Sequence, residues 1–100
     1  MAKQEVKVLH ESESVGRESC KFSKVIELNG KRFKIYHSTG NCYSNTTIDV
    51  MLPTSQWAVV ADRYDIGDCY IDYIWSEAKK KIKMADIYER SVKYIKDVFC

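Results

Sequence analysis

The last third of the chain most constrains its fold, because residues 68–99 carry an apolar pattern with helical spacing. The apolar residues recur at intervals of three or four, which places them on one side of a helix: Ile71, Ile74, Ala78, Ile82, Ala85, Tyr88, Val92, Ile95 and Phe99, with Trp75 beside them. Three acid–base pairs spaced four apart support this helix: Glu77–Lys81, Asp86–Arg90 and Glu89–Lys93. We expect the apolar side to face the core.

The length of this stretch leaves two arrangements open. A single helix would be about 45 Å long at 1.5 Å per residue, whereas a domain of this size has a radius of gyration near 13 Å. Either one long helix overhangs the domain, or two shorter helices meet at a break near residues 83–86. Asp86 and Glu89 could form a weak capping box at that break.

The composition is typical of one small globular domain. Of the 100 residues, 45% are hydrophobic and 30% are charged, so the chain can bury a modest core. Its uncharged apolar runs are only a few residues long, and its first residues lack the zones of a signal peptide. We therefore expect a single domain over residues 1–100, located in the cytoplasm and without a membrane partner.

Residues 23–52 carry the signals of an antiparallel sheet. Val25–Leu28 and Arg32–Tyr36 flank Asn29–Gly30, the preferred pair for a two-residue type I′ turn because both positions need positive φ. This turn sets Leu28 opposite Lys31. Alternation then gives a dry face with Phe22, Ile26, Leu28, Phe33 and Ile35, and a wet face with Glu27, Arg32 and Lys34.

The signals on either side of this hairpin are less regular. Thr46–Leu52 alternates as a further strand, which Pro53 ends because proline has no N–H for a ladder. Before the hairpin, residues 6–9 indicate at most an edge strand. We expect a loop or a mobile segment at Glu11–Ser19 and a loop at Ser38–Asn45.

These elements together predict an α+β fold. We expect a small antiparallel sheet of three to five strands, packed against one long or two shorter C-terminal helices. The dry face of the sheet, extended by Ile48 and Val50, would contact Ile71, Ile74, Trp75, Ala78 and Ile82.

Residues 53–67 fit either a strand or a helix, and periodicity does not separate the two. As a strand, Trp57, Val59 and Ala61 alternate after a turn at 53–56. As a helix, Thr54 or Ser55 caps the start and Gly67 lies beyond the end. The apolar side of that helix would consist of Trp57, Val60, Ala61 and Tyr64.

On the helical alternative, the apolar residues of 57–75 resemble a helix-turn-helix: Val60, Ala61, Tyr64, Ile66, Ile71 and Ile74, with Asp65 where the family usually places the turn glycine. The resemblance implies a DNA-reading surface made by the start of the second helix: Asp68, Cys69, Tyr70, Asp72 and Tyr73. Two carboxylates on that surface oppose contact with the phosphate-lined groove, so we expect weak or no binding to duplex DNA.

The reactive side chains follow no spacing that predicts a cofactor, a metal site or an active site. The cysteines are far apart in the sequence and are expected to be free thiols: Cys20, Cys42, Cys69 and Cys100. His10 and His37 fall in no ligand pattern, and a pairing of Cys42 with His37 has no support beyond proximity in the sequence. We therefore expect a chain that is not an enzyme.

Charge and exposed side chains favour binding to a protein. The net charge is only +2, and the lysines at 79–81 and 83 are typical of a solvated helix face. Opposite the apolar seam we predict a stripe for a protein partner or a second copy: Tyr73, Lys80, Met84, Ile87 and Tyr94. The sequence thus favours a small protein-binding module, such as an adaptor or an inhibitor of a larger host or mobile-element enzyme. A helix-turn-helix-like DNA-binding regulator is the first alternative, and an enzyme without a recognisable motif is the second.

Overall fold

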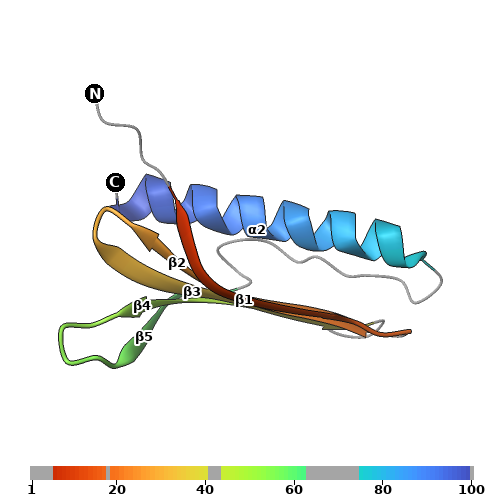
Figure 1. Cartoon of the computed structure of the whole chain (residues 1–100), viewed down its shortest axis with the longest axis horizontal. Coiled ribbons are helices and arrows are strands. Elements are labelled where there is room, and N and C mark those ends of the chain that lie inside the picture. Colours follow the sequence, from red (N-terminus) through yellow and green to blue (C-terminus); the bar gives the residue numbers. More distant parts are fainter. Residues whose placement is uncertain (1–5, 18, 41–43, 63–74, 100) are drawn as a thin grey trace.

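The computed structural model describes residues 6–17, 19–40, 44–62 and 75–99. Within these, five strands form an antiparallel sheet in the order β1-β2-β3-β4-β5, and the helix α2 lies across one face of it (Figure 1). The elements are β1 Lys7–Val15, β2 Ser19–Leu28, β3 Lys31–Gly40, β4 Ser44–Met51, β5 Trp57–Asp62 and α2 Glu77–Phe99. The predicted α+β class is confirmed.

The turn between β2 and β3 has the predicted register. Leu28 lies opposite Lys31 and Ile26 lies opposite Phe33. Both turn residues have positive φ, 53° at Asn29 and 77° at Gly30, as a type I′ turn requires. A two-residue turn of this kind fixes which side chains of β2 and β3 share a face.

The dry face predicted for this hairpin is the buried face of the sheet. Its side chains are at most 3% exposed: Phe22, Ile26, Leu28, Phe33 and Ile35, joined by Ile48 from β4. The helix α2 covers this face, and its direction follows from two ring contacts. Tyr88 meets Phe22 at 6.4 Å and Phe99 meets Phe33 at 5.0 Å, measured between ring centroids. The helix therefore runs toward the end of the sheet that carries the β2–β3 turn.

Two segments expected as loops belong largely to strands. β1 includes residues 11–15, and eight of its nine side chains are exposed, as suits the edge of a sheet. Its Glu11 carboxylate lies 3.7 Å from the Lys24 ammonium of β2. Similarly, β3 continues to Gly40 and β4 begins at Ser44, so the predicted loop at Ser38–Asn45 is too long. Polar side chains, exposed on β1 but largely buried at the ends of β3 and β4, interrupt the apolar alternation that would predict these strands.

Residues 57–62 form a strand, so the strand alternative for this segment is correct there. β5 pairs with β4 and contains a bulge: Ile48 lies opposite Ala61 and Asp49 opposite Val59, which leaves Val60 as the extra residue. The helix-turn-helix needs Val60 and Ala61 in a helix, and that resemblance is wrong for this reason. The residues of its second helix at 68–74 lie outside the described part of the chain.

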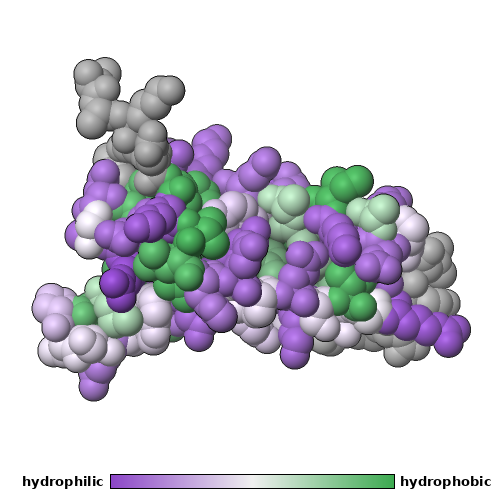
Figure 2. All heavy atoms as spheres, viewed as in Figure 1, coloured by the Kyte–Doolittle hydropathy of each residue, from purple (hydrophilic) through white to green (hydrophobic). Residues whose placement is uncertain are grey.

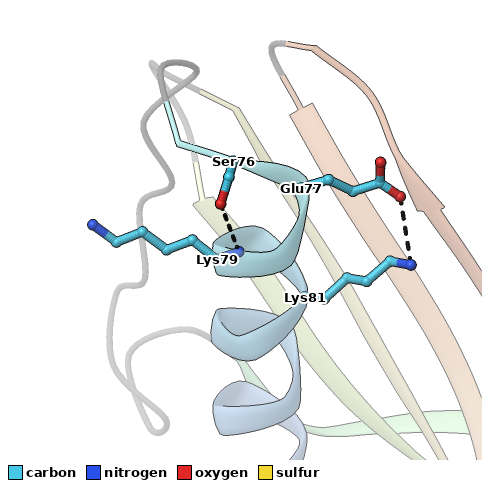
Figure 3. A network of polar contacts seen from close by, with 4 residues as sticks. All are labelled: Ser76, Glu77, Lys79 and Lys81. Carbon is cyan, nitrogen blue, oxygen red and sulfur yellow. Dashed lines mark hydrogen bonds and ion pairs between the residues drawn. The ribbon is translucent and has the colours of Figure 1, made fainter.

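The helix α2 is continuous from Glu77 to Phe99, so of the two alternatives for this stretch the one with a break near residues 83–86 is wrong. Ser76 caps its start, because the Ser76 Oγ accepts a hydrogen bond of 3.2 Å from the Lys79 backbone N–H (Figure 3). Two predicted ion pairs lie along the helix, Lys81–Glu77 at 3.4 Å and Arg90–Asp86 at 3.0 Å. Within the described residues, no helix combines the length and apolar character that a membrane span needs.

The rotation of α2 about its axis differs from the predicted one. The face that meets the sheet consists of Lys80, Met84, Ile87, Ser91 and Ile95. Ala78 and Ala85 of the predicted seam are exposed, and Ile82 is 71% exposed. Tyr88, Val92, Ile95 and Phe99 do contact the core. The prediction that Ala78 and Ile82 pack on the sheet is therefore wrong, while Ile71 and Ile74 lie outside the described residues.

Candidate functional site

The stripe predicted to bind a partner lies mostly inside the domain. Lys80, Met84 and Ile87 are at most 3% exposed because they face the sheet, and Tyr94 is half-buried. Tyr73 lies outside the described residues. The prediction that this stripe stands opposite the core is wrong for its described members, and these four residues form no continuous exposed surface.

The lysine cluster at the start of α2 is engaged within the chain. The Lys79 Nζ lies 4.2 Å from the centroid of the Trp75 ring, and Lys81 pairs with Glu77. Figure 3 shows Lys79 and Lys81 pointing to opposite sides of the helix. The Lys80 Nζ donates hydrogen bonds to the backbone carbonyls of residues 16 and 17, at 3.1 and 2.7 Å. These lysines therefore do not form a shared patch for phosphate.

The histidine at position 37 is a buried residue of the core. Its Nδ1 lies 2.7 Å from the Thr46 Oγ1, and its ring stands 5.8 Å from the Phe22 ring. Burial lowers the pKa of His37 to about 4, so the ring is neutral near pH 7. Cys42, its suggested partner, lies outside the described residues. Among the residues that are described, no three His, Cys, Asp or Glu side chains stand close enough to hold a metal ion.

Exposed apolar side chains gather at one end of the molecule, which we call the turn end because both the β2–β3 turn and the β4–β5 loop lie there. Six of the seven large apolar side chains that are exposed in the described residues belong to it: Val8, Leu9, Leu52, Trp57, Val59 and Val98. The seventh, Ile82, stands alone on the outer side of α2. Apolar groups that cluster in this way mark contact surfaces more often than single ones do.

Strand register places these residues at the same end of the sheet, with Val8 on the edge strand β1 and Trp57 on the opposite edge strand β5. Val8 pairs with Ile26, two residues before the end of β2, and Trp57 pairs with Met51 at the end of β4. Val98 belongs to the last turn of α2, which ends over the same strands. Figure 1 shows the two hairpin tips and the end of α2 on one side of the molecule. Figure 2 shows green, apolar side chains gathered there beside the start of β1.

A cleft of about 590 Å³ opens between the two hairpin tips and the end of α2. It is lined by Gly30, Lys31, Arg32, Val50, Met51, Leu52, Pro53, Ser55 and Phe99. Two of these nine residues are cationic and none is acidic. The Lys31 Nζ lies 5.5 Å from the centroid of the Phe99 ring, which itself packs on Phe33. The cleft thus joins an apolar floor to a positive rim.

The β4–β5 loop that forms one wall of the cleft is held by two backbone hydrogen bonds. The Leu52 N–H donates to the Gln56 carbonyl at 2.8 Å, and the Ser55 N–H donates to the Leu52 carbonyl at 2.9 Å. Ser55 has a φ of 66°, which is uncommon for a residue other than glycine. This closed geometry keeps Leu52 and Trp57 at the surface on either side of the loop.

Sequence reasoning missed the turn end, although one signal for it existed. The strand alternative for 53–67 places a turn at Pro53 and sends Trp57 and Val59 to the same face. The contributions of Val8 and Val98 depend on strand order and helix direction, which no local pattern shows. No family model, curated protein or solved structure matches the chain.

Proposed function

We propose that this chain is a small non-enzymatic protein-binding module, an adaptor or an inhibitor of a larger enzyme, and that the turn end is its contact surface. The observation that carries the proposal is that six of the seven exposed large apolar side chains of the described residues lie at the turn end. One of them, Leu52, lines the cleft that opens there. Covering such side chains contributes roughly 25 cal/mol per Å² of apolar area, which is the main favourable term in most protein association.

The kinds of residue at the turn end also favour a protein partner. Trp57 is 37% exposed, and tryptophan is enriched among the side chains that carry most of the binding energy in interfaces. Met51 and Lys31 add an adaptable apolar group and a polar rim. Since β1, β3, β4, β5 and the helix all contribute residues, the surface is held by the fold rather than by one loop.

DNA binding, the alternative considered from the sequence, has less support. The helix-turn-helix is absent at residues 57–62, and the lysines at 79–81 make contacts within the chain. The net charge of +2 provides little long-range attraction for a polyanion.

Site-specific crosslinking tests the proposal. A photoreactive amino acid replaces Val59 at the turn end, where the side chain is 67% exposed. In the matched control it replaces Ile82 on the outer side of α2, where the side chain is 71% exposed. We expect the probe at Val59 to crosslink one defined protein from the native host's extract, and the probe at Ile82 to give background only. Trp57→Ser in the same chain should reduce the yield at least tenfold.

Two results would contradict this proposal. Equal labelling from both positions would show that exposed apolar groups of this chain capture proteins without selection. A Val59 product that consists only of two copies of the chain would assign the turn end to self-association instead of to an adaptor or inhibitor. Sedimentation of the unmodified chain between 5 and 200 μM distinguishes such a dimer from a crosslinking artefact.

A further inference from the structure

We infer that the cleft at the turn end takes an acidic segment of the partner protein, in which a carboxylate stands beside an apolar side chain. This inference rests on the proposed function and goes further, because it names the chemistry that the surface selects. It depends on three features of the cleft: its uncompensated cations, its apolar floor and its size.

The two cations of the lining approach the cleft from opposite faces of the sheet. Lys31 and Arg32 are neighbours on β3, so their side chains alternate, and the Lys31 ammonium lies on the α2 side near Phe99. Both side chains are exposed, and within the described residues neither forms an ion pair. Glu27 lies opposite Arg32 in the register but does not line the cleft. The carboxylates of an acidic segment that crosses this end of the sheet would therefore meet Lys31 on one face and Arg32 on the other. The described residues of the lining include no competing acid.

The floor of the cleft favours an apolar group next to these carboxylates. Val50, Met51 and Leu52 follow one another at the end of β4, and Phe99 closes the cleft from the helix side. A volume of about 590 Å³ lies in the range of 300–1,000 Å³ that is usual for ligand pockets and is ample for one or two side chains. A partly desolvated contact of this kind strengthens the charge-assisted hydrogen bonds at its rim.

A phosphate group would interact with the cations of the lining but not with its apolar floor. Lys31 and Arg32 suit phosphate as well as carboxylate, but the apolar floor gives nothing to a strongly hydrated phosphate backbone. An acidic peptide with apolar residues uses both parts, and for that reason we assign the cleft to a protein segment rather than to nucleic acid.

A peptide titration tests the chemistry without knowledge of the partner. The ¹⁵N-labelled full chain is titrated with the capped peptide acetyl-ELDFE-amide and with the neutral analogue acetyl-QLNFQ-amide. We expect the acidic peptide to bind at least tenfold more tightly at low salt. The amide signals that shift should belong to the lining, such as those of Lys31, Met51 and Ser55.

Charge reversal with a matched control locates the effect. In Lys31→Glu/Arg32→Glu we expect affinity for the acidic peptide to fall at least tenfold. The control Lys21→Glu/Lys93→Glu changes the net charge equally at two exposed positions outside the lining and should retain the affinity within about twofold. Backbone spectra of both variants before titration show whether each remains folded.

Several results would overturn the inference. Equal affinity for the two peptides, or an equal loss in the two double variants, would exclude selection of a carboxylate by the cleft. Tighter binding of a short oligothymidine than of the acidic peptide would assign the cleft to phosphate. If the probe at Val59 captures its partner equally well with Lys31→Glu/Arg32→Glu, the acidic segment is wrong while the proposed function stands. If selective capture at Val59 fails, the proposed function is wrong whatever the peptides show.

Discussion

The two halves of the interface between α2 and the sheet differ in chemistry. At the turn end the buried residues are apolar: Ile26, Leu28, Phe33, Ile35, Ile48 and Ile95. Toward the other end, where α2 begins, many are polar: His37, Thr39, Ser44, Thr46 and Lys80. We call these the apolar half and the polar half.

The two halves differ in whether they leave a surface for a partner. In the apolar half, burial is non-directional, and the same apolar character continues outward onto the surface of the turn end. In the polar half, specific contacts close the structure on itself, such as His37 with Thr46 and Lys80 with the carbonyls of residues 16 and 17. A buried polar group that loses such a contact is costly, so the polar half leaves little freedom for a partner.

The largest expected effect is on the apolar half. Phe33 is fully buried between β2, β4 and Phe99, so Phe33→Ala should cost about 3–5 kcal/mol of unfolding free energy. This is a large share of the 5–15 kcal/mol that is typical of a domain. Urea unfolding measured by circular dichroism gives the value, and the exposed Val59→Ala serves as control. A cost below about 1 kcal/mol would show that Phe33 does not belong to the core.

The next effect concerns pH and the polar half. Since burial lowers the pKa of His37 to about 4 from 6.5, the unfolded chain takes up the proton first as pH falls. Stability should therefore be full above pH 6.5 and decrease toward pH 4, by about 2 kcal/mol between pH 7.5 and pH 5. Urea titrations at these two pH values measure the change. The variant His37→Gln should remove most of it, and an unchanged slope in that variant would assign the pH dependence to other groups.

A smaller effect is expected where Lys80 closes the polar half. Lys80→Met keeps the apolar stem but removes the two hydrogen bonds to the carbonyls of Gly16 and Arg17, at a cost of about 1–2 kcal/mol. Hydrogen exchange at Cys20, in the first residues of β2, should also become faster. The control Lys81→Met removes only an exposed ion pair and should cost no more than about 0.5 kcal/mol. Equal costs for both variants would show that the buried ammonium does not hold this end together.

The sheet could be predicted where local chemistry determines it. Asn29 and Gly30 adopt the positive φ values that the turn needs, and their register places the side chains of β2 and β3 on the correct faces. β1 was only half predicted, because its solvated edge has no apolar alternation over residues 11–15. Such a strand forms only because β2 offers it a partner.

The rotation of α2 and the candidate site could not be predicted, because both depend on distant partners. Lys80 and Ser91 are polar residues within the buried side of α2, so the sequence pattern through Ala78 and Ile82 is more apolar than the side that faces the sheet. Both polar side chains can be buried because each is hydrogen-bonded. The Lys80 ammonium donates to the carbonyls of residues 16 and 17, and the Ser91 Oγ–H donates to the Ile87 carbonyl of its own helix at 2.9 Å. A seam through Ala78 and Ile82 puts the predicted partner stripe on the side of α2 that the structure buries.

The smallest expected effect tests this rotation directly. Ile82 is 71% exposed on the outer side of α2, so Ile82→Glu should change the unfolding free energy by no more than about 0.5 kcal/mol. The matched variant Ile87→Glu, five residues further along the same helix, places a carboxylate at a site that is 1% exposed and should prevent stable folding. Thermal unfolding of the two variants beside the unmodified chain measures both outcomes. If Ile82→Glu destabilised the domain as strongly as Ile87→Glu, the seam would run through Ala78 and Ile82 after all. The division into an apolar and a polar half would then be lost, because Lys80 would no longer face the sheet.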